Sequence, residues 1–336
     1  MGSLPDFPKP YVIEDCMGAV KLYNNGTVLR CNDTKFKASY VEDESVQYKD
    51  YLYDPKNELK LRVYKPISGN PNPRFPVIFF IHGGGFCVGS FSWSNSHNSC
   101  IRLASTLKVL VVSIDYRLAP ERRLPGAMED AFNAVKWLQR KAMGLSKEDY
   151  ECGGDAAWFK ISEVDFDRVF VVGDSSGGNI AHHLAVRVGS DSAGFDPVRV
   201  RGYVLLAPFF GGVDRTKSEE GPSETVLNLD LLDMFWRLCL PHGEASRDHF
   251  CVNPFGPWSP SLEPLKLDPI LVVAGECELL KDRAKDYAKR LKEMGKKINY
   301  IEFEGEEHGF FTDDPYSEPA NKFVEILKKF IYENST

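Results

Sequence analysis

The chain has 336 residues, of which 43% are hydrophobic and 26% charged, so it has enough apolar material for a substantial core and is not a disordered protein. Its formal net charge of -7 argues against a nucleic acid or an anionic membrane as a partner, because both bind basic surfaces. We therefore expect a small, largely uncharged molecule as the partner, and the sequence leaves the oligomeric state open.

The N-terminus lacks the charged region and apolar run of a secretory signal, and no apolar stretch reaches about 18 residues. We therefore expect neither secretion nor a membrane anchor. The eight cysteines include no Cys-x-x-Cys pair, so we expect free, mostly buried thiols and neither a metal nor another cofactor. These features indicate a reducing compartment, the cytoplasm, with the nucleus as an alternative location.

The first element in chain order is a predicted β-hairpin over Ala19–Leu29. Two alternating runs flank the dipeptide Asn25-Gly26, and Asn-Gly favours the tight turn that joins antiparallel strands. The hairpin lies in the segment of about 1–45 that precedes the main strand pattern. We expect this segment to form part of a cap.

Short apolar runs predict buried strands, and the amphipathic patterns between them predict helices. The strands are expected at Val77–Ile81, Val109–Ile114, Val169–Val172, Tyr203–Leu206, Ile270–Ala274 and Ile298–Phe303. The helices are expected at Ala127–Lys141, Asn179–Val188, Leu231–Leu240, Lys281–Met294 and Ala320–Tyr332. This alternation predicts a single α/β domain, residues 1–336, with a mostly parallel sheet and helices on both faces.

The region 208–269 interrupts this alternation. It carries no strong parallel-strand pattern, but it does carry an apolar helical pattern that includes Phe235 and Trp236. We interpret the region as an insertion above the sheet, which together with the N-terminal segment forms the cap.

A nucleophile is predicted at Ser175. The strand Val169–Val172 runs into Gly173-Asp174-Ser175-Ser176-Gly177, which fits the Gly-x-Ser-x-Gly elbow on which a serine sits at a strained strand-to-helix turn. Such a turn exposes the serine oxygen at the end of the strand. Ser175 is therefore the leading candidate for nucleophilic attack.

An oxyanion hole is predicted upstream, where the strand Val77–Ile81 ends in His82-Gly83-Gly84-Gly85-Phe86. Consecutive glycines leave backbone N–H groups free to point at a ligand, and an HGGG-type loop forms the oxyanion hole of lipases and esterases. Fixed donors there stabilise the negative oxygen of a tetrahedral intermediate. We expect the donors to be the N–H groups of Gly84, Gly85 and Ser176.

A base and an acid are predicted downstream. His308 follows the last apolar strand, where it can take the proton of Ser175 and return it to the leaving group. The carboxylate that orients this histidine is expected in Gly275–Asp282, which offers Glu276, Glu278 and Asp282. The order serine, acid, histidine is the order of α/β-hydrolases.

Taken together, these motifs resemble the hormone-sensitive-lipase-like family, and more closely the plant carboxylesterases related to the gibberellin receptor. The segments that carry the resemblance are His82–Phe86, Asp115–Glu121, Gly173–Gly178, Gly275–Asp282 and His308–Phe310. The resemblance implies an α/β-hydrolase fold and a serine carboxylesterase that works through an acyl-enzyme.

Within the family, Gly202–Leu240 and Leu279–Tyr287 resemble the carboxylesterases that hydrolyse strigolactones, which implies a strigolactone-type ester or lactone as substrate. The family pattern has an aspartate in the catalytic slot, which here falls on Glu278. Glutamate is an accepted variant of this acid. Glu276 and Asp282 stay open as alternatives.

Aromatic residues could line an acyl or ring pocket, although at helical spacing they also serve as ordinary core. These residues are Phe86, Phe209, Phe210, Phe235 and Trp236. Two other functions are compatible with the family. One is a hormone receptor with little or no turnover, against which the presence of His308 argues. The other is a lyase, against which the intact elbow and glycine loop argue.

Overall fold

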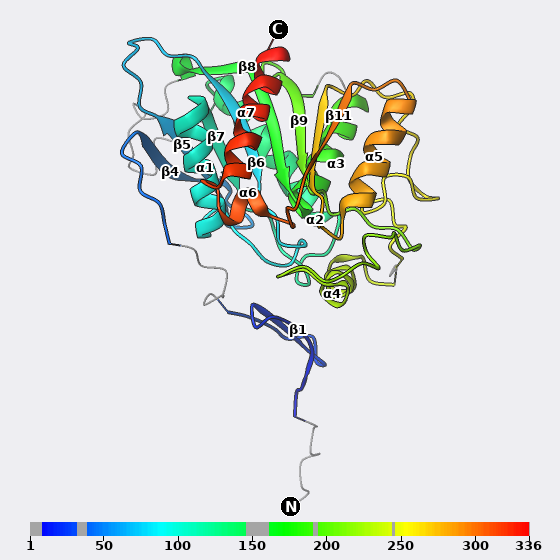
Figure 1. Cartoon of the computed structure of the whole chain (residues 1–336). Coiled ribbons are helices and arrows are strands. Elements are labelled where there is room, and N and C mark those ends of the chain that lie inside the picture. Colours follow the sequence, from blue (N-terminus) through cyan, green and yellow to red (C-terminus); the bar gives the residue numbers. More distant parts are fainter. Residues whose placement is uncertain (1–8, 32–38, 146–160, 191–193, 244–245, 336) are drawn as a thin grey trace, which may run out of the picture.

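The computed structural model describes residues 9–31, 39–145, 161–190, 194–243 and 246–335. They form a large central sheet with helices on both faces and a separate small sheet near the N-terminus (Figure 1). Cys152 and parts of the predicted N-terminal cap segment lie outside the described residues.

The central sheet has eight strands in the order β11-β10-β9-β8-β6-β7-β5-β4. Neighbours from β11 to β7 pair in parallel, and β5 and β4 add on as antiparallel strands. Their bounds are β4 Val46–Asp54, β5 Leu59–Pro66, β6 Phe75–Ile81, β7 Leu110–Ile114, β8 Val164–Asp174, β9 Val200–Leu206, β10 Ile270–Gly275 and β11 Ile298–Phe303. The predicted mostly parallel sheet is confirmed.

Helices cover the two faces separately. Helices α1, α6 and α7 pack on one face, and α2, α3 and α5 on the other (Figure 1). The bounds are α1 Ser94–Leu107, α2 Gly126–Ala142, α3 Ser176–Ser190, α4 Leu229–Cys239, α5 Lys281–Glu293, α6 Phe310–Asp313 and α7 Glu318–Glu333, with a 3-10 turn at Ile161–Glu163. No described helix combines the length and hydrophobicity needed to cross a membrane.

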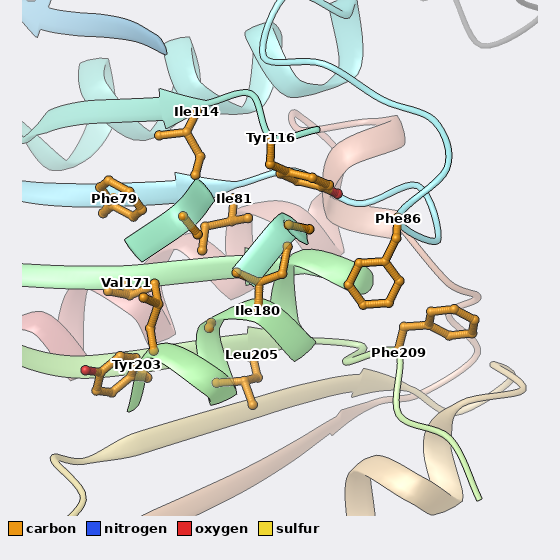
Figure 2. Close-up of a cluster of buried hydrophobic side chains, with 14 of the residues drawn as sticks. Phe79, Ile81, Phe86, Ile114, Tyr116, Val171, Ile180, Tyr203, Leu205 and Phe209 are labelled. Carbon is orange, nitrogen blue, oxygen red and sulfur yellow. The ribbon is translucent and has the colours of Figure 1, made fainter. Parts of the chain in front are cut away.

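The central strands contain long apolar runs because both of their faces are buried. On β6, Val77, Phe79 and Ile81 belong to the core under α2 and α3, whereas Ile78 and Phe80 belong to the core under α1 and α7. Figure 2 shows the first of these cores, with Phe79 and Ile81 among its members. The continuous apolar runs of the sequence have this physical origin.

The elements of the central domain that were not predicted include β4, β5 and α1. Strand β4 is an edge strand whose side chains are mostly exposed or half-buried, and β5 pairs with it in antiparallel fashion. Helix α1 buries polar residues, including Ser96, His97 and Asn98. Neither β4 nor α1 carries the apolar pattern on which strand and helix predictions depend.

The predicted hairpin is confirmed by the pairing of β2 (Val20–Tyr23) with β3 (Val28–Arg30). Strand β1 (Val12–Cys16) adds to it and completes a three-stranded antiparallel sheet. Ion pairs tie this sheet to the rest of the molecule: Glu14 contacts Arg237 of α4 at 2.6 Å, and Arg30 contacts Glu121 at 2.6 Å.

Most of the described cysteines are buried, in agreement with the prediction for the thiols. Cys16, Cys87, Cys100, Cys239 and Cys251 are buried, whereas Cys31 and Cys277 are exposed.

Candidate active site

Ser175 lies on the turn between the end of β8 and the start of α3. Its φ of 53° is in the left-handed region, a strain of about 1–3 kcal/mol that persists only where the surrounding structure holds it. A Cβ on Gly173 would lie 2.1 Å from the carbonyl oxygen of Gly177, and a Cβ on Gly177 would lie 2.1 Å from that of Ile81. Close backbone approach therefore requires both glycines of the predicted elbow.

Backbone hydrogen bonds hold Ser175 from both sides. Its N–H donates to the carbonyl oxygen of Leu206 at 2.8 Å, and its carbonyl oxygen accepts from the N–H of Phe209 at 2.9 Å. The residue is 8% exposed, and within the described ranges its hydroxyl has no hydrogen-bond partner. The backbone is thus fixed while Oγ stays available to a reacting group.

The glycine loop after β6 packs directly against this turn. A Cβ on Gly83 would lie 3.1 Å from the Cβ of Ser175. Gly84 and Gly85 have φ values of 112° and 58°, which favour glycine. In the part of the chain that the structure describes, the N–H groups of Gly84 and Gly85 donate no hydrogen bond. Two of the three predicted oxyanion donors are therefore free of backbone partners, on a loop that packs against the turn of Ser175.

Two residues outside the predicted catalytic and oxyanion set hold this loop. The Tyr116 hydroxyl donates to the carbonyl oxygen of His82 at 3.1 Å and lies 3.3 Å from the hydroxyl of Ser176. Arg30 of the N-terminal sheet donates to the carbonyl oxygen of Cys87 at 2.7 Å. Burial lowers the pKa of His82 to about 4, so this histidine is neutral and structural.

His308 contacts Glu278. Nδ1 of His308 lies 3.3 Å from Oε2 of Glu278, whose side chain is 1% exposed. Burial raises the pKa of Glu278, and the hydrogen bond with His308 lowers it in part. Burial lowers the pKa of His308, but the hydrogen bond and charge of Glu278, together with Asp174 and Glu224, outweigh it and raise that pKa to about 9. The pair is therefore strongly coupled.

The other two acids of the loop after β10 point elsewhere. Glu276 is exposed and accepts a hydrogen bond from the N–H of Gly305 at 2.9 Å. Asp282 accepts one from the N–H of Ser218 at 2.9 Å. Of the alternatives that the sequence left open, the structure places Glu278 against the histidine.

We expect Glu278→Gln to lower the pKa of His308 from about 9 toward about 6.5, the ordinary value for histidine. An amide keeps the volume of the side chain but removes the charge that favours the imidazolium. NMR titration of the His308 ring signals measures this change. The matched control is Glu276→Gln, which removes an acid from the same loop without touching the histidine, and which should leave the titration of His308 nearly unchanged. Equal titrations in the two variants would contradict the pairing.

Asp174, immediately before Ser175, is a second buried carboxyl at the site. Burial raises its pKa to about 7. The charges of Asp313 and Glu278 also raise this pKa, whereas the charge of His308 lowers it. His308 therefore lies within electrostatic range of Asp174, the residue before Ser175. The topology agrees, because β8, β10 and β11 are parallel strands whose carboxyl ends meet at one edge of the sheet.

Of the five aromatic residues predicted to line a pocket, four lie in or near the glycine loop: Phe86, Phe209, Phe235 and Trp236. Phe209 stacks on Trp236 with ring centroids 3.7 Å apart, and it lies 6.1 Å from Phe86 (Figure 2 shows Phe86 and Phe209). The ring of Phe235 lies against Gly85, since a Cβ there would be 2.4 Å from it. Helix α4 therefore brings aromatic surface onto the predicted oxyanion loop.

Phe210 belongs to a different group. Its ring packs 4.8 Å from that of Tyr287 and 5.6 Å from that of His182. His182 and Tyr287 share a hydrogen bond at 2.9 Å, and all of these side chains are buried. Its part in substrate binding stays a prediction, and its contacts are those of a core residue beneath α3.

Known proteins similar to this chain include members of one hydrolase family. The sequence matches the model of a family described as having the alpha/beta hydrolase fold over residues 78–312. It is similar to a 3-O-acetylpapaveroxine carboxylesterase of Papaver somniferum, with 34% identity over 84% of this chain and 87% of that protein. It is also similar to a gibberellin receptor of Arabidopsis thaliana, with 35% identity over 78% of this chain and 74% of the receptor.

Solved structures show the same similarity. An esterase of Pyrobaculum calidifontis superposes with a TM-score of 0.68 and 30% identity, over 85% of each chain.

Proposed function

Since this chain belongs to the family with the alpha/beta hydrolase fold and is a carboxylic ester hydrolase, we propose that it cleaves small neutral esters or lactones through an acyl-enzyme on Ser175. The predicted α/β-hydrolase fold is confirmed by the family match and by the esterase structure. One observation carries the proposal: His308 is paired with the buried Glu278 at the sheet edge where the strained turn presents Ser175.

In the first half-reaction, His308 takes the proton of Ser175 as Oγ attacks the ester carbonyl carbon. Because Nδ1 faces Glu278, Nε2 is the ring nitrogen left for the serine. The carbonyl oxygen becomes an oxyanion and accepts from the N–H groups of Gly84, Gly85 and Ser176. The carbon–oxygen bond to the alcohol then breaks, and His308 gives its proton to the leaving alkoxide.

In the second half-reaction, water replaces the serine as nucleophile. His308 takes a proton from water, the resulting hydroxide attacks the acyl carbon, and the same N–H groups hold the second oxyanion. The bond to Oγ breaks, Ser175 recovers its proton from His308, and the carboxylic acid leaves. A buried Glu278 stabilises the imidazolium in both halves.

Among small esters and lactones, we propose a strigolactone-type hormone as the substrate, because its butenolide ring contains an ester carbonyl. It is supported by the sequence resemblance over Gly202–Leu240 and Leu279–Tyr287. The first of these segments contains α4, whose Phe235 lies against the glycine loop, and the second adjoins Glu278. Neutral aromatic surface next to the oxyanion donors suits an uncharged ring better than a charged acyl group.

The proposal includes a cap formed by about 1–45 and 208–269, and a cytoplasmic location with the nucleus as the alternative. The contacts that support the cap are the Glu14–Arg237 ion pair, the bond from Arg30 to the carbonyl oxygen of Cys87, and the packing of Phe235 on Gly85. Burial of most described thiols suits a reducing compartment.

The alternative is a receptor that binds a hormone and does not turn it over, which is raised by the similarity to the gibberellin receptor. Reaction with a fluorophosphonate separates the two functions, because only an activated serine forms a stable adduct. We expect intact-protein mass spectrometry to show one adduct, peptide mapping to place it on Ser175, and Ser175→Ala to form none. A wild-type protein that forms no adduct would favour the receptor.

A further inference from the structure

Glu224 connects the loops that carry Glu278 and His308. It belongs to the chain between β9 and α4, far from both loops in sequence. Its Oε1 accepts the N–H of Leu279 at 2.7 Å, and its Oε2 accepts the N–H of His308 at 2.7 Å. One carboxylate is therefore bonded to the backbone next to the acid and to the backbone of the base.

We propose that Glu224 is a positioning residue that fixes Glu278 and His308 relative to each other. The inference rests on the proposed function, since it assigns to this side chain the alignment of the catalytic acid with the catalytic base. Glu224 would act through these two backbone N–H groups and would take no part in making or breaking bonds.

The chemistry of the bridge requires a carboxylate. An ionised carboxyl group is an acceptor on both oxygens, whereas the amide of glutamine carries an acceptor on one side and donors on the other. A glutamine at position 224 would face one of the two N–H groups with its own NH2. Hydrogen bonds from N–H to a carboxylate are also shorter and stronger than neutral ones, as the two 2.7 Å distances reflect.

Neighbouring contacts join the same segment to the same loops. The N–H of Thr225 donates to Oε2 of Glu307 at 3.0 Å. The hydroxyl of Ser218 donates to the carbonyl oxygen of Leu279 at 2.7 Å. Segment 218–225 thus holds both loops, and Glu224 is the residue whose side chain bonds to both at once.

The bridge matters because the contact that it supports is a long one. The sheet itself aligns the two loops as far as Cys277, whose N–H donates to the carbonyl oxygen of Glu306 at 2.9 Å. Beyond that point the 3.3 Å separation between His308 and Glu278 depends on how the loops are held. A small displacement of either loop is enough to break it.

The charges of Glu278, Asp174 and Glu224 raise the pKa of His308. The charge of His308 in turn lowers the pKa of Asp313. Loss of the Glu224 charge therefore makes the imidazolium less favourable. His308 must be neutral to act as a base, so activity falls at low pH, where His308 becomes protonated. This acidic limb of the plot of kcat against pH should therefore move to lower pH. A loss of packing that left this charge in place would not shift this limb.

The test compares Glu224→Gln with Glu220→Gln, which removes the same charge from an exposed neighbour whose side chain has no hydrogen bond or ion pair with either loop in the described ranges. For Glu224→Gln, per fluorophosphonate-labelled site, we expect kcat for an aryl ester to fall about 10- to 100-fold with KM within about twofold. The acidic limb should also move to lower pH. Glu220→Gln should match wild type in all three measurements.

Glu224→Asp provides the second variant. It keeps the charge but is one methylene shorter, so it cannot bridge both N–H groups. We expect a reduced kcat with the acidic limb in place, and this comparison decides the question if Glu224→Gln does not fold. Equal kcat and an equal limb in the Glu224 and Glu220 variants would overturn the inference. If Ser175→Ala also retains turnover, it is the proposed function that fails; if Ser175→Ala is inactive, only the role of Glu224 fails.

Discussion

Ser175→Ala is expected to lower kcat for a simple aryl ester by at least about 10⁴-fold, and up to about 10⁶-fold. The change removes the atom that forms the acyl bond and leaves the backbone bonds to Leu206 and Phe209 in place. The remaining rate over water would come from the oxyanion donors and from binding. Steady-state kinetics measures the loss, and calorimetry with an unreactive ester analogue should show nearly unchanged affinity.

A matched control lies on the same helix. Ser190 ends α3, and its hydroxyl donates only to the carbonyl oxygen of Arg187 among the described residues, so Ser190→Ala should keep wild-type kinetics. Near-normal turnover in Ser175→Ala would show that Ser175 is not the nucleophile.

Gly84→Ala is expected to lower kcat/KM by at least about 10³-fold, because it affects both the shape of the oxyanion loop and the N–H group that it presents. A Cβ at this position would lie 2.1 Å from the carbonyl oxygen of Val88, and the φ of 112° is strained for any side chain. The loop must move, and loss of one oxyanion donor alone costs about 10²- to 10³-fold. Kinetics with the aryl ester measures the effect.

Gly295→Ala separates the effect on the loop from the cost of backbone strain. Gly295 also has a positive φ, 72°, but a Cβ there meets nothing within 4 Å. We expect a loss of stability of about 1–2 kcal/mol in thermal or chemical unfolding and unchanged kinetics. If Gly84→Ala kept wild-type kcat/KM, the oxyanion donors would have to lie elsewhere.

The predicted strands and helices were found, with end shifts that are largest at β8, which begins at Val164 and not at Val169. The strands were found because β6 to β10 are buried on both faces, and such strands have continuous apolar runs in their sequence. Helix α1 was not predicted because the first half of its buried face is polar: Ser96, His97 and Asn98 find partners only in the folded chain. For example, Asn98 bonds to the backbone of Val41 at 2.9 Å.

The residues that support the site were missed for a related reason. Tyr116 bonds to His82, which is 34 residues away, and Glu224 bonds to His308, which is 84 residues away. No local pattern marks a side chain whose partners are so distant. In the sequence, a tyrosine or glutamate that bonds to a particular backbone group looks like one that faces solvent. Only the fold determines which N–H or carbonyl oxygen lies next to it.

The sequence by itself determined the turn that carries Ser175, because the glycines at 173 and 177 and the preceding strand express a local steric demand that few other residues meet. It also determined that a histidine follows the last strand. Only the tertiary structure decided which acid faces that histidine. Glu276, Glu278 and Asp282 lie within seven residues of one another and carry the same charge. The loop buries Glu278 against His308 and turns Glu276 and Asp282 toward other backbone donors. The direction in which a side chain points and the degree of its burial are properties of the folded chain. They distinguish three carboxyl groups that the sequence alone does not distinguish.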